Sequence, residues 1–178
     1  LQIEKIAKDF LEKSKDKKIC VISHFDTDGI SSAAIMTKTL RKLDKEFSIE
    51  IIKNLEKEFI KTLPKDKIIL FLDLASGSLD NIKEAGLENV FILDHHEITQ
   101  EVPDNVQIAN PQLHSKQKIS GSGITYLFCK EINSGSKELA KLAILGMIGD
   151  RLEKDIGKIN NHILEDAEIK TKRGLLIY

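Results

Sequence analysis

The chain has 178 residues, which is enough for one domain with its own hydrophobic core. Charged residues make up 31% of it but nearly cancel, leaving a formal net charge of −1. Composition therefore does not require a polyanionic partner, although one could bind through a local patch. No apolar run approaches membrane-spanning length, and Cys20 and Cys129 form no CxxC pair. We expect a cytoplasmic protein with free thiols and no membrane association.

The first third of the chain alternates between helical and strand-like patterns. Apolar residues at helical spacing, Ile3, Ile6 and Phe10, predict an N-terminal helix. A strand is predicted over 18–24, a helix over 29–43, a strand over 47–52 and a short helix over 55–62.

The remaining chain continues the alternation. A continuously apolar strand, KIILFLD, ends at Asp73, and a second one, NVFILD, ends at Asp94. A short helix lies between them, and a short strand is predicted near 106–109 within a loop-rich stretch. Two helices follow, over 121–132 and 137–149, and the second is apolar nearly all round and so expected to be buried. The pattern predicts an α/β fold, a doubly wound parallel sheet with helices on both faces.

Ionisable side chains gather where the predicted strands end. The segment VISHFDTDGISSAAI, residues 21–35, places His24, Asp26 and Asp28 at alternating positions, and the later strands end at Asp73 and Asp94. The carboxyl ends of parallel strands meet in one crevice, where open α/β sheets bind ligands. A single such aspartate would be most simply explained as a helix N-cap. Several together repel unless a cation is bound, and carboxylate with imidazole suits Mn²⁺ or Mg²⁺, or else Zn²⁺.

Three other motifs share some of these letters. A calcium-binding loop with Gly29 at its sixth position would begin at His24 and end at Ile35, where acidic ligands are required, so we reject it. The stretch GSGITY, which begins at residue 121, lacks the third glycine of a dinucleotide-binding loop. FDTDGIS also resembles a haloacid-dehalogenase-type phosphatase, with a late element at Gly149, Asp150 and Asp155. That family has no use for the two histidines after Asp94, so it remains a minor alternative.

Four ordered motifs match another family better. LDHHE contains Asp94, His95 and His96; SHFDTDGISSAAI, FLD and AILGMIGD supply the first, second and fourth motifs, the last ending at Asp150. In this order and spacing the chain resembles the DHH phosphoesterase superfamily. The form S-H-x-D-x-D-G-I is most similar to the archaeal RecJ-like nucleases. The resemblance covers nearly the whole chain and implies a five-stranded sheet.

The resemblance implies roles for particular residues. Asp73 would bridge two divalent cations, Mn²⁺ or alternatively Mg²⁺, that lie ~3.5–4 Å apart. His24 and Asp26 would hold the first ion, and Asp28, His95 and Asp150 the second. His96 would contact the phosphate or protonate the leaving group, while Asp94 orients an imidazole.

Glycine-containing turns are candidate substrate-binding elements. Gly29 would allow a close backbone approach at the start of a helix. The amides of Ser120, Gly121, Ser122 and Gly123 precede another helix and could bind a phosphate, although simple helix capping explains them equally well.

The resemblance also implies a domain arrangement and a function. RecJ-like enzymes carry a second, DHH-associated domain that binds substrate; we expect residues 1–178 to be the catalytic domain, with that second domain absent from this chain. The expected function is a two-metal exonuclease acting on single-stranded DNA or RNA in replication or repair. Two alternatives stay open: a replisome scaffold that partners GINS-type proteins, and a small-molecule phosphodiesterase or phosphatase.

Overall fold

A computed structural model describes residues 2–113, 117–152, 156–172 and 175–177. Its centre is a five-stranded sheet in the order β2-β1-β3-β4-β5, in which every neighbouring pair is parallel. The strands are β1 (Ile19–His24), β2 (Phe47–Ile52), β3 (Ile68–Leu72), β4 (Val90–Leu93) and β5 (Val106–Ala109). The predicted α/β class, the strand number and the all-parallel sheet are confirmed.

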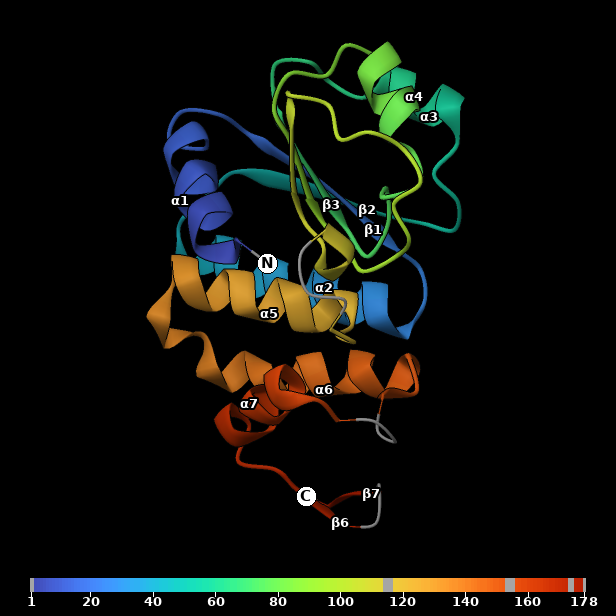
Figure 1. Ribbon diagram of the computed structural model, residues 1–178. Helices are drawn as coiled ribbons and strands as arrows, with labels where there is room; N and C mark the ends of the chain where they lie inside the picture. The colour runs from blue at the N-terminus through green and yellow to red at the C-terminus, as the bar shows by residue number, and fades with distance from the viewer. Residues whose placement is uncertain (1, 114–116, 153–155, 173–174, 178) are drawn as a thin grey trace.

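Helices cover both faces of the sheet, as Figure 1 shows. On one face lie α1 (Ile3–Lys13), α2 (Thr27–Lys42) and α5 (Gly121–Ile132); on the other lie the short helices α3 (Lys57–Thr62) and α4 (Leu79–Glu84). Because both faces are covered, β3 and β4 are buried at every position, which explains their continuous apolar sequences.

A hydrophobic core lies on each face of the sheet, and aromatic rings pack in the larger one, under α1, α2 and α5. The ring of Phe10 from α1 lies 5.3 Å from that of Phe91 in β4 and 5.4 Å from that of Phe128 in α5, both edge-on. Such edge-to-face contacts add about 0.5–1.5 kcal/mol to the burial of each pair. This packing ties α1 and α5 to the centre of the sheet.

The C-terminal part forms an outer layer that the sequence did not fully predict. Helix α6 (Ala140–Gly149) packs on α2 and α5 on their side away from the sheet, so Leu145 and Ile148 stay exposed and the expectation of a fully buried helix is wrong. Helix α7 (Lys158–Asp166) and a small antiparallel sheet of β6 (Lys170–Lys172) and β7 (Leu175–Ile177) were not predicted. The Tyr126 hydroxyl donates a 2.8 Å hydrogen bond to Asp166, which joins α5 to α7.

Strand order also fixes where a ligand can bind. The chain passes from β1 outward to β2 and then returns across β1 to β3, so the connections leave β1 and β3 in opposite directions. In sheets of this order, the crevice beyond the carboxyl ends of those two strands is the usual ligand site. His24 ends β1 and Asp73 follows β3, so both lie at this crevice.

Candidate metal centre

All eight residues expected at the centre lie at the carboxyl end of the sheet or at the helix ends beside it. They come from the end of β1, the start of α2, the segments after β3 and β4, and the end of α6: His24, Asp26, Asp28, Asp73, Asp94, His95, His96 and Asp150. Their ligand atoms form three overlapping groups, within each of which all atoms are less than 4.8 Å apart. The fold therefore brings together residues that span most of the chain.

The first group joins His24, Asp26 and Asp73. Nδ1 of His24 lies 3.0 Å from Oδ2 of Asp26 and 3.7 Å from Oδ2 of Asp73. Asp26 is also the N-cap of α2, since its Oδ1 accepts a 2.9 Å hydrogen bond from the Gly29 amide. This cap starts the helix at Thr27, two residues earlier than predicted, and it leaves Oδ2 of Asp26 directed to the histidine.

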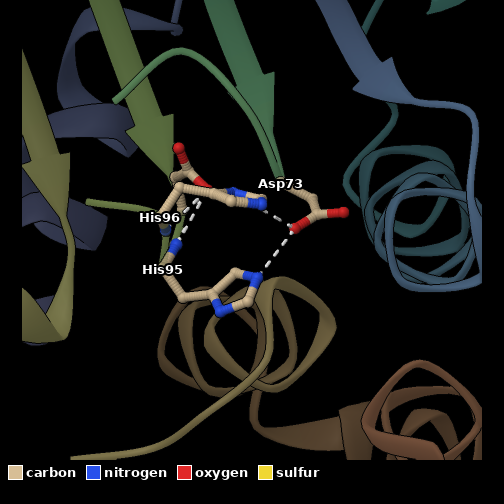
Figure 2. A group of neighbouring side chains, drawn as sticks. Asp73, His95 and His96 are labelled. Atoms are coloured by element: carbon tan, nitrogen blue, oxygen red, sulfur yellow. Dashed lines mark hydrogen bonds and ion pairs between the residues drawn. The ribbon is translucent and has the colours of Figure 1, made fainter. Parts of the chain in front are cut away.

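The second group joins Asp28, His95 and Asp150. Nε2 of His95 lies 3.3 Å from Oδ2 of Asp150 and 3.8 Å from Oδ2 of Asp28. The same nitrogen is 3.3 Å from Oδ1 of Asp73, so Asp73 has one oxygen beside each group. Figure 2 shows the rings of His95 and His96 extending toward the Asp73 carboxylate.

Asp28 is held in place by the start of α5. Its carboxylate accepts hydrogen bonds from the amides of Gly121 at 2.6 Å and Ser122 at 2.9 Å, while Gly123 donates to the Ser120 hydroxyl. All four residues of this turn are buried. Three of the four amides expected to bind a substrate phosphate, those of Gly121, Ser122 and Gly123, are thus already bonded within the protein, and Ser120 is the N-cap of α5, which favours the capping alternative. The Gly29 amide is likewise taken by Asp26.

Glycines allow these helices to come close enough to the carboxylates. A Cβ atom on Gly121 would lie 2.7 Å from Oδ1 of Asp73, and one on Gly146 would lie 2.2 Å from Oδ1 of Asp28. On Gly29 it would lie 2.2 Å from the His24 carbonyl oxygen, so the glycine allows the start of α2 to lie against the end of β1. Gly146 was missed as a site residue; an isolated glycine inside an apolar helix was the available signal.

Asp94 is a fully buried anchor for the histidine pair. Its Oδ1 accepts from the His95 amide at 2.8 Å and lies 2.7 Å from Nδ1 of His96, and its Oδ2 accepts from the Ser76 amide at 2.9 Å. Burial alone would raise the pKa of Asp94, but the hydrogen bonds from His96 and Ser76 outweigh it and lower that pKa to about 2. The same hydrogen bond raises the pKa of His96. Asp94 therefore stays charged and fixes the His96 ring through Nδ1.

Asn110, which follows β5, reinforces this anchor. Its Nδ2 donates to the Ser76 hydroxyl and to the His96 carbonyl, both at 2.9 Å. Ser76 itself was not singled out from the sequence. Together the two residues tie the segment after β3 to the segment after β4.

The remaining carboxylates carry charge that the protein alone does not balance. Burial, followed by repulsion from Asp28, raises the pKa of Asp73 to about 10 and that of Asp150 to about 7. Both oxygens of Asp73, Oδ2 of Asp150 and Nδ1 of His24 are buried and accept or donate no hydrogen bond. Asp150 also caps the carboxyl end of α6, where the helix dipole disfavours a negative charge. These unbonded oxygen and nitrogen atoms fit divalent cations such as Mn²⁺ or Mg²⁺.

The fold and this cluster define an α/β protein with a carboxylate–imidazole centre that could hold metal. Residues 18–147, more than half of the chain, match the family described as "DHH family, N-terminal domain". The chain therefore belongs to the DHH family. Asp155, which the haloacid-dehalogenase alternative required, lies outside the described residues.

Relatives and solved structures agree with the family. The chain is 33% identical over 179 residues to the uncharacterized protein MJ0831 of Methanocaldococcus jannaschii and 26% identical over 153 residues to the single-stranded-DNA-specific exonuclease RecJ of Bacillus subtilis. These alignments cover 93% and 77% of this chain but 41% and 19% of the relatives. The chain thus spans less than half the length of either relative.

Two solved structures share the fold. An exonuclease RecJ bound to manganese superposes with a TM-score of 0.78 at 22% identity, covering 94% of this chain and 47% of that one. CDC45 from Entamoeba histolytica superposes with a TM-score of 0.69 at 19% identity, covering 96% of this chain and 38% of that one. Within the described residues, no helix combines the length and the apolar character needed to cross a membrane.

Proposed function

We propose that this chain is the catalytic domain of a two-metal-dependent phosphodiester hydrolase, a RecJ-like exonuclease that acts on single-stranded DNA or RNA. One observation carries the proposal. Asp73 is 1% exposed, both of its carboxylate oxygens lack a hydrogen-bond donor, and it lies between two groups of ligand atoms. A buried carboxylate between two such groups has the position of a ligand that bridges two cations.

Each group would hold one ion. His24 and Asp26 would hold the first, and Asp28, His95 and Asp150 the second, with Mn²⁺ preferred and Mg²⁺ as the alternative. When bound, such a pair of ions clamps the scissile phosphate, lowers the pKa of a water and stabilises the leaving oxygen. The Asp28 carboxylate is fixed for this task by the two amides of α5.

His96 is suited to act on the leaving group. Its side chain is half exposed, and Nδ1 is engaged by Asp94, which leaves Nε2 directed away from that anchor. Because the Asp94 bond raises the pKa of His96, the imidazolium form persists to higher pH. We infer that Nε2 donates a proton to the leaving oxygen and that Asp94 positions the ring.

The relatives support a proposal for the substrate and the cellular setting. The Bacillus relative is specific for single-stranded DNA, so single strands are the first substrate to test. We propose a cytoplasmic protein of DNA replication or repair whose substrate cleft is completed by a DHH-associated domain.

A panel of 5′- and 3′-labelled DNA and RNA oligomers, incubated with Mn²⁺, tests the proposal. We expect stepwise release of nucleotides from single strands, loss of activity with EDTA, and a drop of several orders of magnitude for Asp73→Asn. A wild-type protein that binds Mn²⁺ yet cleaves no member of the panel would contradict it.

The similarity to CDC45 supports a second candidate, a replisome scaffold that binds GINS-type proteins. Full retention of the ionisable cluster favours the enzyme, because a scaffold would gain nothing from burying three mutually repelling carboxylates, Asp28, Asp73 and Asp150. Metal-independent binding of a GINS-type partner, together with absence of cleavage, would favour the scaffold.

A further inference from the structure

An exposed aromatic ring stands beside the candidate metal centre. Phe25, between His24 and Asp26, is 47% exposed, whereas every other phenylalanine or tyrosine whose side chain the structure describes is buried or half-buried. Its ring centroid lies 5.0 Å from that of His24, edge to face. An exposed ring at this place forgoes the stability that burial in the core would supply.

A basic side chain lies next to this ring because of strand register. His24 pairs with Ile52 of β2, so the next residues along the two strands, Phe25 and Lys53, are neighbours. Nζ of Lys53 lies 5.9 Å from the centroid of Phe25, within the range of a cation–π contact. Lys53 is exposed, and within the described residues it pairs with no carboxylate.

A cavity of about 260 Å³ connects Lys53 to the candidate centre. His24, Asp73 and His96 line it from the centre, and Lys53, Asn54 and Gly77 line it from the side of β2 and of the segment after β3. Pockets that bury a whole small ligand are commonly about 300–1,000 Å³, so this one suits part of a polymer such as one nucleotide. Phe25 does not line the cavity, but its ring lies next to two residues that do, His24 and Lys53.

Each feature matches one part of a nucleotide. The bases of a single strand stack on exposed aromatic rings. A lysine that lacks a carboxylate partner binds phosphate, and here it supplies positive charge beside a strongly acidic cluster. We propose that Phe25 and Lys53 form a binding subsite for the nucleotide next to the scissile phosphate, with its base on Phe25 and a backbone phosphate on Lys53. This inference rests on the proposed nuclease function and specifies how that site takes single strands.

The test compares variants on matched single strands. One oligomer carries the fluorescent base 2-aminopurine at its terminal position, and a second carries an abasic residue there. Binding is followed by fluorescence quenching and anisotropy in Ca²⁺, in place of the two proposed catalytic ions, and cleavage in Mn²⁺ by kcat and KM. The variants are Phe25→Ala, Phe25→Tyr and Lys53→Ala; the controls are Ile30→Ala, an exposed apolar residue of α2, and Lys17→Ala, an exposed lysine at the opposite end of the sheet.

Phe25→Ala is expected to abolish the quenching and to raise KM roughly tenfold or more, with Phe25→Tyr restoring both. This penalty should shrink on the abasic strand, where no base can stack. Lys53→Ala should weaken the binding of every strand and lower the slope of log affinity against log salt by roughly one. The two controls should behave as wild type.

Two failures are distinguishable. If wild type cleaves the strands and Phe25→Ala binds and cleaves them equally well, the subsite is wrong and the nuclease function stands. If wild type cleaves nothing, the nuclease function fails, and the quenching experiment in Ca²⁺ still decides whether a base stacks on Phe25. If Phe25→Ala lost the same amount of affinity for the normal strand and for the abasic strand, the stacking role would also be overturned. Each variant must keep the Mn²⁺-dependent rise in melting temperature, so that a lost metal site is not mistaken for a lost subsite.

Discussion

The backbone amide of Gly121 donates a 2.6 Å hydrogen bond to Oδ2 of Asp28, which joins the start of α5 to the start of α2. Together with the Ser122 amide, it directs a buried carboxylate toward His95. Two helix starts distant in sequence therefore shape one half of the candidate centre. The glycine at 121 is required because any side chain there would meet both Asp28 and Asp73.

This contact predicts the effect of Gly121→Ala. The new Cβ would lie 2.7 Å from Oδ1 of Asp73 and 3.0 Å from Oδ2 of Asp28, so the two carboxylates must move. We expect Mn²⁺ affinity, measured by calorimetric titration, to fall about 10- to 100-fold, as for other residues that orient metal ligands. Gly157→Ala is the matched control, because a Cβ there would meet nothing within 4 Å. Wild-type affinity in Gly121→Ala would contradict the geometry.

The metal-free protein should lose stability as pH rises. Burial and the neighbouring Asp28 raise the pKa of Asp73 to about 10 and that of Asp150 to about 7, so the folded state keeps protons that the unfolded chain releases above pH ~4. The stability linked to these protons is complete below pH ~4 and is lost as pH rises toward the folded pKa values. Each extra proton contributes a slope of about −1.4 kcal/mol per pH unit.

Urea denaturation in EDTA between pH 5 and 8 measures this slope. Asp73→Asn removes one of the two carboxyl groups whose pKa is raised. It should therefore reduce the slope of stability against pH by the contribution of about one proton, roughly 1.4 kcal/mol per pH unit. Mn²⁺ affinity should change in the opposite direction and increase with pH, because the ligands must lose their protons to bind. A metal-free stability that is flat or that rises over this range would show that these carboxyls are not protonated in the folded protein.

Asp94→Ala should be strongly destabilising. The substitution removes a buried carboxylate and leaves the Ser76 amide, the His95 amide and the His96 ring without their acceptor. Each donor that loses its acceptor inside the protein typically costs about 1–3 kcal/mol. Chemical denaturation of the metal-free protein checks this, with Asp26→Ala, a half-exposed carboxylate, as the comparison expected to cost less. Equal costs for the two variants would contradict the anchoring role.

His96→Gln separates proton transfer from metal binding. We expect the rate of cleavage to fall about 10²- to 10⁴-fold, the usual contribution of a general acid, with Mn²⁺ affinity nearly unchanged. His162→Gln is the control, since the two histidine side chains are similarly exposed, 53% for His96 and 54% for His162, and His162 lies on α7. A His96→Gln protein that no longer binds Mn²⁺ would assign His96 to the metal ligands instead.

The sheet and the acidic strand ends could be predicted because their signals are local. Strands β3 and β4 are continuously apolar and end in Asp73 and Asp94, so both the burial and the position of these acids follow from the sequence. Asp26 shows a limit of such patterns, because N-cap and candidate ligand were competing explanations. In the structure Oδ1 caps α2, and Oδ2 lies 3.0 Å from Nδ1 of His24 and stays a candidate ligand atom.

What could not be predicted depends on contacts between distant segments. Nothing in the turn 120–123 indicates that its amides face Asp28, because the contact spans 93 positions. Gly146 is needed only because α6 crosses α2 at that point, and α7 follows a polar sequence with weak helical signals whose position is set by the Tyr126 contact with Asp166.

Anomalous diffraction from crystals soaked in Mn²⁺ tests the central claim most directly. The account predicts two peaks, one beside His24, Asp26 and Asp73 and one beside Asp28, His95 and Asp150, with the Asp73 carboxylate touching both. A single peak beside Asp26 with His95 turned away, or no peak at Asp73, would contradict a two-metal centre in this protein.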